Sequence, residues 1–222
     1  MQVQKVSIVK SILSANDQVA NTNRKLLDEH GIFSLNIMAS PGAGKTSLIL
    51  QTIQILSTHH KIGVIEGDTA PVTIDSEKMT AVGIPSVQIN TGGDCHLDAM
   101  MIDEALKQLD LDKLNLIIVE NVGNLICPAA FKLGTHLNVL IASVPEGDDK
   151  PYKYPAMYRG VDILILNKID LLPYVTFNQE YFLQGVKILN PSLQIFPVSC
   201  KTGEGIQEWK KWLSSHVQTQ KK

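Results

Sequence analysis

Short apolar runs alternate with longer amphipathic stretches along most of the chain. The apolar runs are strand-sized and rich in Val, Ile and Leu, and they cover Phe33–Ala39, Ile62–Glu66, Ser86–Ile89, Leu116–Glu120, Leu137–Val144, Ile163–Asn167 and Gln194–Val198. Between most of them, apolar residues recur at helical spacing, for example over Lys45–Leu56, Leu97–Leu109, Asn178–Leu189 and Gly205–His216. Apolar strands that alternate with helices predict a parallel sheet covered on both faces. The pattern therefore predicts an α/β fold with three layers.

We expect one main domain with a helical segment before it. Apolar residues at helical spacing from Ser11 to His30 predict a helix within an N-terminal segment of residues 1–30, and Gly31 is a suitable residue to end it. No linker, repeat or low-complexity stretch interrupts the alternation that follows, so residues 31–216 are predicted to form a single domain. Residues 217–222 are predicted to be a short C-terminal tail.

Composition and charge exclude several functional classes. The 222 residues include 20 basic and 22 acidic ones, a net charge of −2, so we expect no nucleic-acid partner. No apolar run approaches the ~20 residues of a membrane span, and the N-terminus lacks the apolar stretch of an export signal. The three cysteines form no disulfide-dense cluster. We therefore expect a cytoplasmic protein with reduced thiols and no membrane partner.

A phosphate-binding loop follows the first apolar run. The string Ser40-Pro41-Gly42-Ala43-Gly44-Lys45-Thr46-Ser47 lies between a predicted strand and a predicted helix, as in a P-loop. In that loop backbone N–H groups and the helix N-terminus hold phosphates, a lysine (Lys45) reaches the β and γ oxygens, and a hydroxyl (Thr46) ligates Mg²⁺. Ala39 replaces the first glycine of the usual pattern. The fold class predicted is thus a three-layer, parallel-sheet P-loop NTPase with an N-terminal helix.

Two later strings predict that the base of the nucleotide is guanine. Asn167-Lys168-Ile169-Asp170 ends a strand, and the carboxylate of Asp170 can accept hydrogen bonds from the guanine N1–H and 2-amino groups. Adenine would leave that acceptor unpaired. Ser199-Cys200-Lys201 follows the next strand, where GTPases usually carry a Ser-Ala-Lys loop that contacts the base. These signals predict GTP and GDP as ligands.

Carboxylates at the ends of two other strands are candidates for magnesium binding and catalysis. Asp68 follows the second apolar run and Glu120 ends the fourth, so both are predicted to lie at the edge of the sheet that carries the phosphate loop. With Lys45 they are the predicted catalytic residues, and with Thr46 they are the predicted Mg²⁺ ligands. Asp75 is a weaker candidate for the same ion. Ordinary solvated loop carboxylates remain the alternative for all three.

Cys95, His96 and Cys127 form a candidate site for a softer metal. All three follow predicted strands at the edge where the nucleotide is expected, and two thiolates with one imidazole suit Zn²⁺ or Ni²⁺ far better than Mg²⁺. Two buried structural cysteines beside an unrelated histidine explain the same residues about equally well. For the neighbouring Met100-Met101 pair, core packing is favoured over a role as soft ligands.

Taken together, these motifs resemble the hydrogenase nickel-incorporation GTPases, the HypB family. The resemblance covers Phe33 to Leu213 and rests on the phosphate loop and on Cys95-His96-Leu97-Asp98-Ala99, Glu120-Asn121-Val122-Gly123-Asn124-Leu125-Ile126-Cys127-Pro128, Glu146-Gly147-Asp148-Asp149-Lys150-Pro151, Asn167-Lys168-Ile169-Asp170-Leu171-Leu172-Pro173 and Lys201-Thr202-Gly203-Glu204-Gly205. It implies slow hydrolysis of GTP and nickel delivery during maturation of nickel-iron hydrogenase. It also implies a GTP-bound homodimer with Cys95, His96 and Cys127 as metal ligands at the interface. The implied partners are a small zinc-containing nickel metallochaperone and the hydrogenase large subunit.

The chain departs from many members of that family at its N-terminus. Residues 1–31 contain neither a Cys-x-x-Cys-Gly-Cys motif nor a His-rich stretch, so nickel storage is not predicted. Three other functions stay open. A urease nickel accessory protein typically carries Cys-Pro-His at its metal site, which this chain lacks, and an ATP-dependent kinase is disfavoured by Asp170. A scaffold that binds nucleotide without hydrolysing it is the third.

Overall fold

The protein is built on one parallel sheet. The computed structural model describes residues 8–69 and 83–220, and within them seven strands pair in the order β3-β2-β4-β1-β5-β6-β7, every pair parallel. The strands are β1 (Phe33–Ala39), β2 (Ile62–Asp68), β3 (Ser86–Asn90), β4 (Leu116–Glu120), β5 (Leu137–Ser143), β6 (Ile163–Asn167) and β7 (Gln194–Pro197). Each lies within a residue or two of the range that the apolar pattern predicted.

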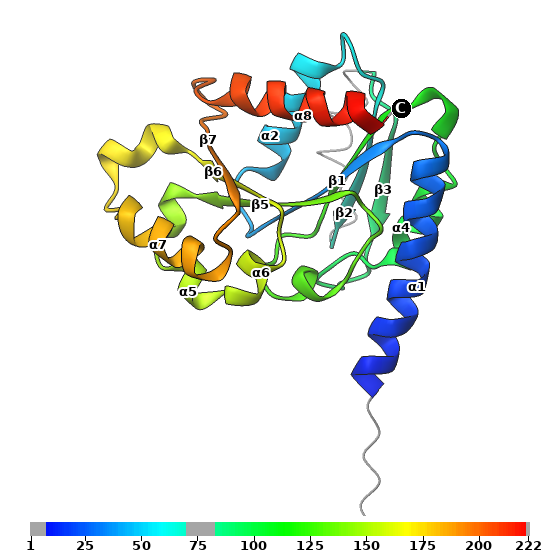
Figure 1. The fold of residues 1–222 in the computed structure, drawn as a ribbon, viewed down its shortest axis with the longest axis horizontal. Coiled ribbons are helices and arrows are strands. Elements are labelled where there is room, and N and C mark those ends of the chain that lie inside the picture. Colours follow the sequence, from blue (N-terminus) through cyan, green and yellow to red (C-terminus); the bar gives the residue numbers. More distant parts are fainter. Residues whose placement is uncertain (1–7, 70–82, 221–222) are drawn as a thin grey trace, which may run out of the picture.

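Helices cover both faces of the sheet, which confirms the predicted three-layer α/β fold (Figure 1). They are α1 (Ile8–Glu29), α2 (Lys45–Leu56), α4 (Ala99–Leu106), α5 (Lys150–Lys153), α6 (Pro155–Arg159), α7 (Gln179–Leu189) and α8 (Ile206–Gln220), with short 3₁₀ turns η1 (Leu111–Lys113), η2 (Cys127–Ala130), η3 (Val144–Glu146) and η4 (Ile169–Tyr174). α2 and α8 pack on one face, and α1, α4 and α5–α7 pack on the other. None of the described helices combines the length and apolarity that crossing a membrane requires.

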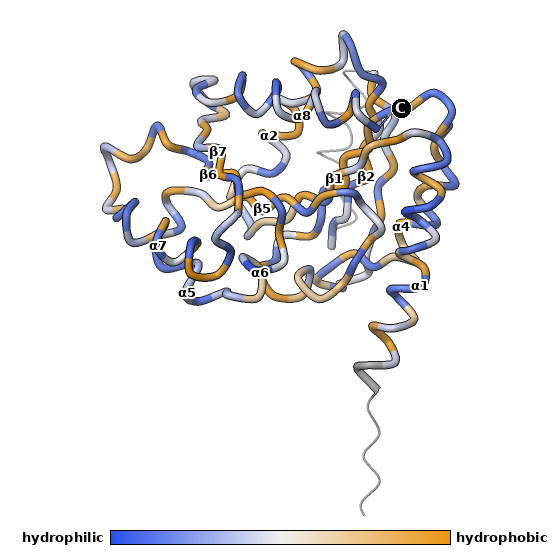
Figure 2. Tube along the Cα trace, in the orientation of Figure 1, coloured by the Kyte–Doolittle hydropathy of each residue, from blue (hydrophilic) through white to orange (hydrophobic). Residues whose placement is uncertain are grey.

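Alternation along the strands builds two apolar layers separated by the sheet. In Figure 2 the strands form the hydrophobic centre of the molecule, while the helices show hydrophilic outer faces. On the α2/α8 face, residues such as Leu35 and Ile37 join one continuous cluster. On the other face the apolar residues form two clusters, one under α6 and α7 and one under α1 and α4. Buried Asn36 on β1 and its β5 partner Asn138 share a side-chain hydrogen bond of 3.0 Å.

The C-terminal end of the main domain differs from the boundary predicted, whereas the N-terminal end agrees with it. α8 continues to Gln220, and Val217 is fully buried in the apolar cluster, so the prediction of a tail from residue 217 is wrong for residues 217–220. The reason is that Val217 extends the apolar stripe of Leu213 by one helical turn. At the other end, α1 stops where Gly31 adopts a φ of 63°, as expected for a helix terminator.

The strand order places the loops that carry the predicted nucleotide residues at the carboxyl-end edge of the sheet. β1 is flanked by β4 on one side and β5 on the other, and the chain crosses β1 when it passes from β4 to β5. Ligands of open α/β sheets bind at such a switch point, outside the carboxyl ends of the strands. The segments after β1, β2, β4 and β6, which carry the predicted nucleotide residues, all emerge there.

Candidate nucleotide and metal site

The phosphate loop has the close packing that its glycines predict. Gly44 has a φ of 104°, and a Cβ built on it would lie 2.4 Å from the side-chain nitrogen of Asn167. That nitrogen donates to the carbonyl of Ala43 at 2.9 Å. The Lys168 ammonium donates to the carbonyl of Gly42 at 2.7 Å. The guanine-reading motif is thus tied directly to the phosphate loop, and only glycine fits at position 44.

A cleft of about 410 Å³ opens over this loop and collects the predicted phosphate and magnesium residues. Its lining includes Gly42, Gly44, Lys45, Thr46, Ser47, Glu66, Gly67, Asp68, Glu120, Asn121, Gly123 and Lys168. α2 begins at Lys45, so its first N–H groups point toward the cleft. The cleft therefore offers a helix N-terminus and an ammonium to an anion.

Oxygen donors for a hard cation line the same cleft. The Thr46 hydroxyl donates to a carboxylate oxygen of Glu120 at 3.0 Å, and Glu66 is the register partner of Glu120 on β2. Asp68 ends β2 beside them. Hydroxyl and carboxylate oxygens are the donor set that suits Mg²⁺. Asp75, the fourth predicted ligand, lies outside the described residues.

A second cleft, of about 380 Å³, continues from the first toward the guanine-reading residues. It is lined by Gly44, Ser47, Asn167, Lys168, Asp170, Leu171, Cys200 and Lys201. Gly44, Ser47 and Lys168 line both clefts, so the two clefts are adjacent. The buried Ser199 hydroxyl donates to Asp170 at 2.6 Å, which fixes the carboxylate at the cleft. The predicted phosphate and base residues are thus brought together in the order that a nucleotide requires.

In the base cleft, Lys168 has an unusual backbone conformation and Cys200 has a raised pKa. Lys168 has a φ of 61°, the one positive value among the described non-glycine residues, and its N–H is held by the Asn167 side chain at 2.8 Å. Burial, reinforced by the nearby Asp170 carboxylate, raises the pKa of Cys200 to about 11. The Cys200 thiol therefore stays protonated at neutral pH.

Cys95, His96 and Cys127 lie together, as predicted. Their ligand atoms all lie within 4.8 Å of one another, and the Cys95 sulfur is 3.6 Å from Nδ1 of His96. Sulfur and nitrogen ligands of one tetrahedral ion, at about 2.3 and 2.05 Å, are separated by about 3.6 Å. A hydrogen bond with the Cys127 side chain, helped by desolvation, raises the pKa of the Cys95 thiol above its ordinary value. The donor set and spacing fit one thiophilic cation.

Buried contacts join the metal cluster to the phosphate cleft. The N–H of Leu97, the residue after His96, donates to the side-chain oxygen of Asn121 at 3.1 Å, and Asn121 directly follows Glu120. Leu97 also packs on β2, where a Cβ on Gly67 would lie 2.7 Å from its side chain. Gly123 lies against the phosphate loop, since its Cβ would be 3.2 Å from Pro41.

Sequence reasoning missed several residues of this arrangement. Glu66 and Asn121 are nearly or fully buried polar residues in the phosphate cleft, and Glu146 binds the Ser40 hydroxyl at the start of the phosphate loop. The signal for Glu66 was a charge inside an apolar strand run. The core-packing prediction for the Met100-Met101 pair is wrong for Met100, which is 64% exposed, because α4 directs it away from the sheet.

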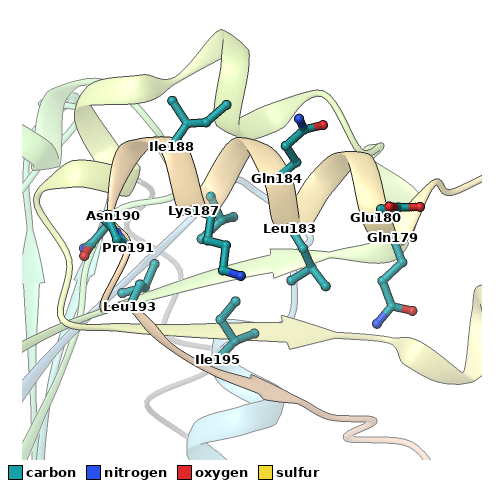
Figure 3. A pocket seen from close by; sticks show the side chains of 11 residues that line it. Gln179, Glu180, Leu183, Gln184, Lys187, Ile188, Asn190, Pro191, Leu193 and Ile195 are labelled. Atoms are coloured by element: carbon teal, nitrogen blue, oxygen red, sulfur yellow. The ribbon is translucent and has the colours of Figure 1, made fainter.

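A groove larger than either of these clefts lies elsewhere on the described part of the chain. This groove of about 1030 Å³ runs between α7 and β7, where Leu183 and Lys187 face Leu193 and Ile195 (Figure 3). No residue predicted for the nucleotide or the metal lines it. The residues predicted to bind the nucleotide therefore lie at the smaller clefts, at the ends of β1, β2, β4 and β6.

Comparison with known proteins agrees with the geometry. Residues 34–197 match the family described as CobW/HypB/UreG, nucleotide-binding domain. The chain is 44% identical to the hydrogenase maturation factor HypB of Azotobacter chroococcum mcd 1 over 212 residues, which is 96% of this chain and 69% of that protein. The chain belongs to the HypB family. The predicted resemblance is thereby confirmed, and the family is one of nucleotide-binding proteins.

Two solved HypB structures share the fold over nearly the whole chain. HypB from Archaeoglobus fulgidus aligns with a TM-score of 0.86 at 39% identity and covers 92% of this chain and 99% of that one. HypB from Helicobacter pylori, solved in complex with nickel, aligns with a TM-score of 0.87 at 34% identity and covers 92% of this chain and 96% of that one. The fold of this chain is thus that of solved HypB proteins over nearly its whole length.

Proposed function

We propose that the protein hydrolyses GTP to GDP and phosphate, and that it uses this reaction to deliver nickel during hydrogenase maturation. The observation that carries the proposal is the hydrogen bond between Leu97 and Asn121, which links the metal cluster to the end of β4. Family membership supports the same function, because the relatives are hydrogenase maturation factors and one was solved with nickel.

In the proposed reaction, the phosphate loop positions the nucleotide and the cleft carboxylates organise the attack. Backbone N–H groups of the loop and Lys45 hold the β and γ phosphates, while Asp170 reads the guanine edge. Thr46, Asp68 and Glu120 are the proposed ligands for Mg²⁺, which when bound supplies positive charge that balances the phosphates. Water attacks the γ phosphorus, the bond to the β–γ bridging oxygen breaks, and the water proton leaves with the phosphate.

Nickel is the proposed cargo of the cysteine–histidine cluster. Three protein ligands leave further positions of the ion open, so a partner can supply a ligand before the last protein bond breaks. The site also suits Zn²⁺ by ligand type. Loss of the γ phosphate would shift the segment from Glu120 to Cys127 and thereby move one ligand relative to the other two.

We further propose that GTP binding brings two copies together over this cluster. Ile126, beside Cys127, is 68% exposed, and Met100 on the first turn of α4 is 64% exposed. Large apolar side chains that are exposed beside a functional site are typical of an interface. The homodimer would then exchange nickel with a small zinc-containing metallochaperone and with the hydrogenase large subunit.

Cysteine variants test this function. In Cys95→Ala and in Cys127→Ala, we expect stoichiometric binding of Ni²⁺ and Zn²⁺ to be lost, while GTP turnover stays within a few-fold of the unmodified protein. Cys200→Ala is the matched control, because Cys200 is a cysteine outside the cluster, and it should keep full metal stoichiometry. Unchanged metal binding in the Cys95/Cys127 double variant would overturn the metal assignment. Absence of phosphate release under all conditions would favour the nucleotide-binding scaffold.

A further inference from the structure

Helix α1 contacts both chain segments that carry the metal cluster. One segment runs from Cys95 into α4, and the other runs from Cys127 through η2 to β5. α1 lies alongside α4 (Figure 1) and makes its helix-to-helix packing there. Gly134, on the second segment, approaches α1 so closely that a Cβ on it would lie 2.4 Å from the carbonyl oxygen of Ala20. α1 therefore holds the two segments from one side.

Asn16 of α1 bonds to both segments with one side chain. Its Oδ1 accepts from the N–H of Ala99 at 2.8 Å, and its Nδ2 donates to the carbonyl of Lys132 at 2.8 Å. Ala99 follows Cys95 and His96 at the start of α4, and Lys132 follows Cys127 after η2. A single amide thus sets the spacing between the two stretches of backbone.

Asn23 repeats this arrangement two turns further along α1. Its Nδ2 donates to the carbonyl of Ala99 at 2.8 Å and to the carbonyl of Leu133 at 3.1 Å. The side chain is fully buried, and its Oδ1 has no hydrogen-bond partner among the described residues. An apolar residue would avoid the cost of that buried oxygen. The two carbonyl contacts, and not packing, therefore explain an amide at this position.

The anchored residues lie next to the metal ligands. The ring of Phe131, adjacent to Lys132, packs on the His96 ring at a tilt of 32°, with 4.0 Å between ring centroids. The segment that carries His96 is also held from the sheet, because the N–H of Leu97 donates to the side-chain oxygen of Asn121. Asn16 thus fixes the backbone beside a ring that orients His96, as well as the helix start that follows His96.

We propose that Asn16 and Asn23 are positioning residues of the metal site, which hold the Cys95-His96 segment and the Cys127 segment at the separation that one ion requires. The inference rests on the proposed role of these three residues as metal ligands. Residues outside the ligand set that orient ligands typically alter metal affinity by about 10- to 100-fold. The exposed Asp17–Lys132 ion pair at 3.1 Å joins the same elements, but exposed pairs of this kind contribute little.

Substitution of Asn16 tests the proposal in the full-length protein. In Asn16→Ala we expect the affinity for Ni²⁺, measured by competition with a chelator, to fall by about 10-fold or more, and the thiolate-to-nickel absorption band to change. Asn16→Asp keeps the acceptor for the Ala99 N–H and loses the donor to the Lys132 carbonyl. Its Ni²⁺ affinity should therefore lie between those of Asn16→Ala and the unmodified protein. Asn21→Ala is the matched control, because Asn21 is an exposed asparagine of the same helix and should bind Ni²⁺ normally.

The outcomes separate this inference from the function on which it rests. If nickel binding depends on Cys95 and Cys127 but Asn16→Ala and a folded Asn23→Ala bind Ni²⁺ with unchanged affinity and spectrum, the positioning role is refuted alone. If nickel binding does not depend on the cysteines, the proposed function fails first. A lower melting temperature in Asn16→Ala with unaltered nickel affinity would show a purely structural role and would also refute the proposal.

Discussion

Gly44 of the phosphate loop lies against the side chain of Asn167, the first residue of the guanine-reading motif, with space for no Cβ between them. The phosphate loop and the guanine-reading motif are therefore in direct contact in the folded protein, although the two residues are far apart in the chain. Asn167 uses the same side chain to bond Ala43 and Lys168. Gly44 lines both clefts, so this contact lies where the phosphate cleft and the base cleft adjoin.

Gly44→Ala should disrupt this contact. The new Cβ would lie 2.4 Å from Asn167, and the φ of 104° is unfavourable for alanine, so we expect a loss of about 1–3 kcal/mol in unfolding free energy and a large loss of GTP affinity. Gly31→Ala is the control, because Gly31 also has a positive φ but has open space around it. Denaturant unfolding and nucleotide titration measure both effects. GTP affinity that is reduced no more by Gly44→Ala than by Gly31→Ala would contradict the contact.

Asp170→Asn should change which nucleotide binds best. The carboxylate can accept from two guanine donors, whereas an amide presents one donor and one acceptor. We expect GTP affinity to fall by about 10- to 100-fold, equivalent to roughly 1–3 kcal/mol, and affinity for xanthosine triphosphate to rise. Competition among GTP, ATP and xanthosine triphosphate measures the order. Ser199→Ala, which removes the 2.6 Å bond to Asp170, should weaken GTP binding less, and an unaltered order in Asp170→Asn would refute base reading.

Asn121→Ala should make the nickel affinity independent of which nucleotide is bound. Without the acceptor for the Leu97 N–H, the segment of His96 loses its buried link to the end of β4. We expect nickel to bind still, but with an affinity that no longer differs between GDP and a non-hydrolysable GTP analogue. Asn121→Asp keeps the acceptor and loses the 3.1 Å bond that Asn121 donates to Asn36, so it should retain the difference. Equal coupling in Asn121→Ala and in the unmodified protein would exclude this route.

Stability should fall at mildly acidic pH because of His136. Its Nδ1 accepts from the Ser34 N–H at 3.1 Å and its Nε2 lies 2.9 Å from Asp28, which identifies the neutral ring. Burial lowers the pKa of His136, although Asp28 opposes this. The unfolded chain therefore takes up the proton first, and the contribution of the neutral ring is full above pH ~6.5 and is lost as pH falls below it.

His136→Gln measures this contribution. The decline in unfolding free energy between pH 7 and pH 5, at most about 1.4 kcal/mol per pH unit for one group, should be smaller in this variant than in the unmodified protein. His59→Gln is the control, because His59 is exposed, and it should leave the decline unchanged. Identical pH dependence in His136→Gln and the unmodified protein would show that His136 does not titrate as its surroundings indicate.

Contiguous motifs could be predicted from the sequence, and contacts between distant segments could not. The phosphate loop and the Asn167–Asp170 string carry their chemistry in adjacent residues, so the order of strand, loop and helix was enough to place them. The Asn121–Leu97 and Asn16–Lys132 contacts depend on which strands are neighbours and on how α1 packs, which periodicity does not specify. The burial of Val217 could have been predicted from the sequence, because its spacing from Leu213 continues the apolar stripe of α8.

The central claim is that the nucleotide state changes how the Cys95, His96 and Cys127 cluster holds its ion. The most direct measurement is Ni²⁺ affinity, with oligomer size recorded on the same samples, for the protein loaded with GDP and with a non-hydrolysable GTP analogue. Coupling free energies of this kind are typically about 1–3 kcal/mol, which corresponds to roughly 5- to 150-fold in affinity. We expect a dimer and tighter nickel binding with the analogue. Equal nickel affinity and equal oligomer size in the two states would contradict the account.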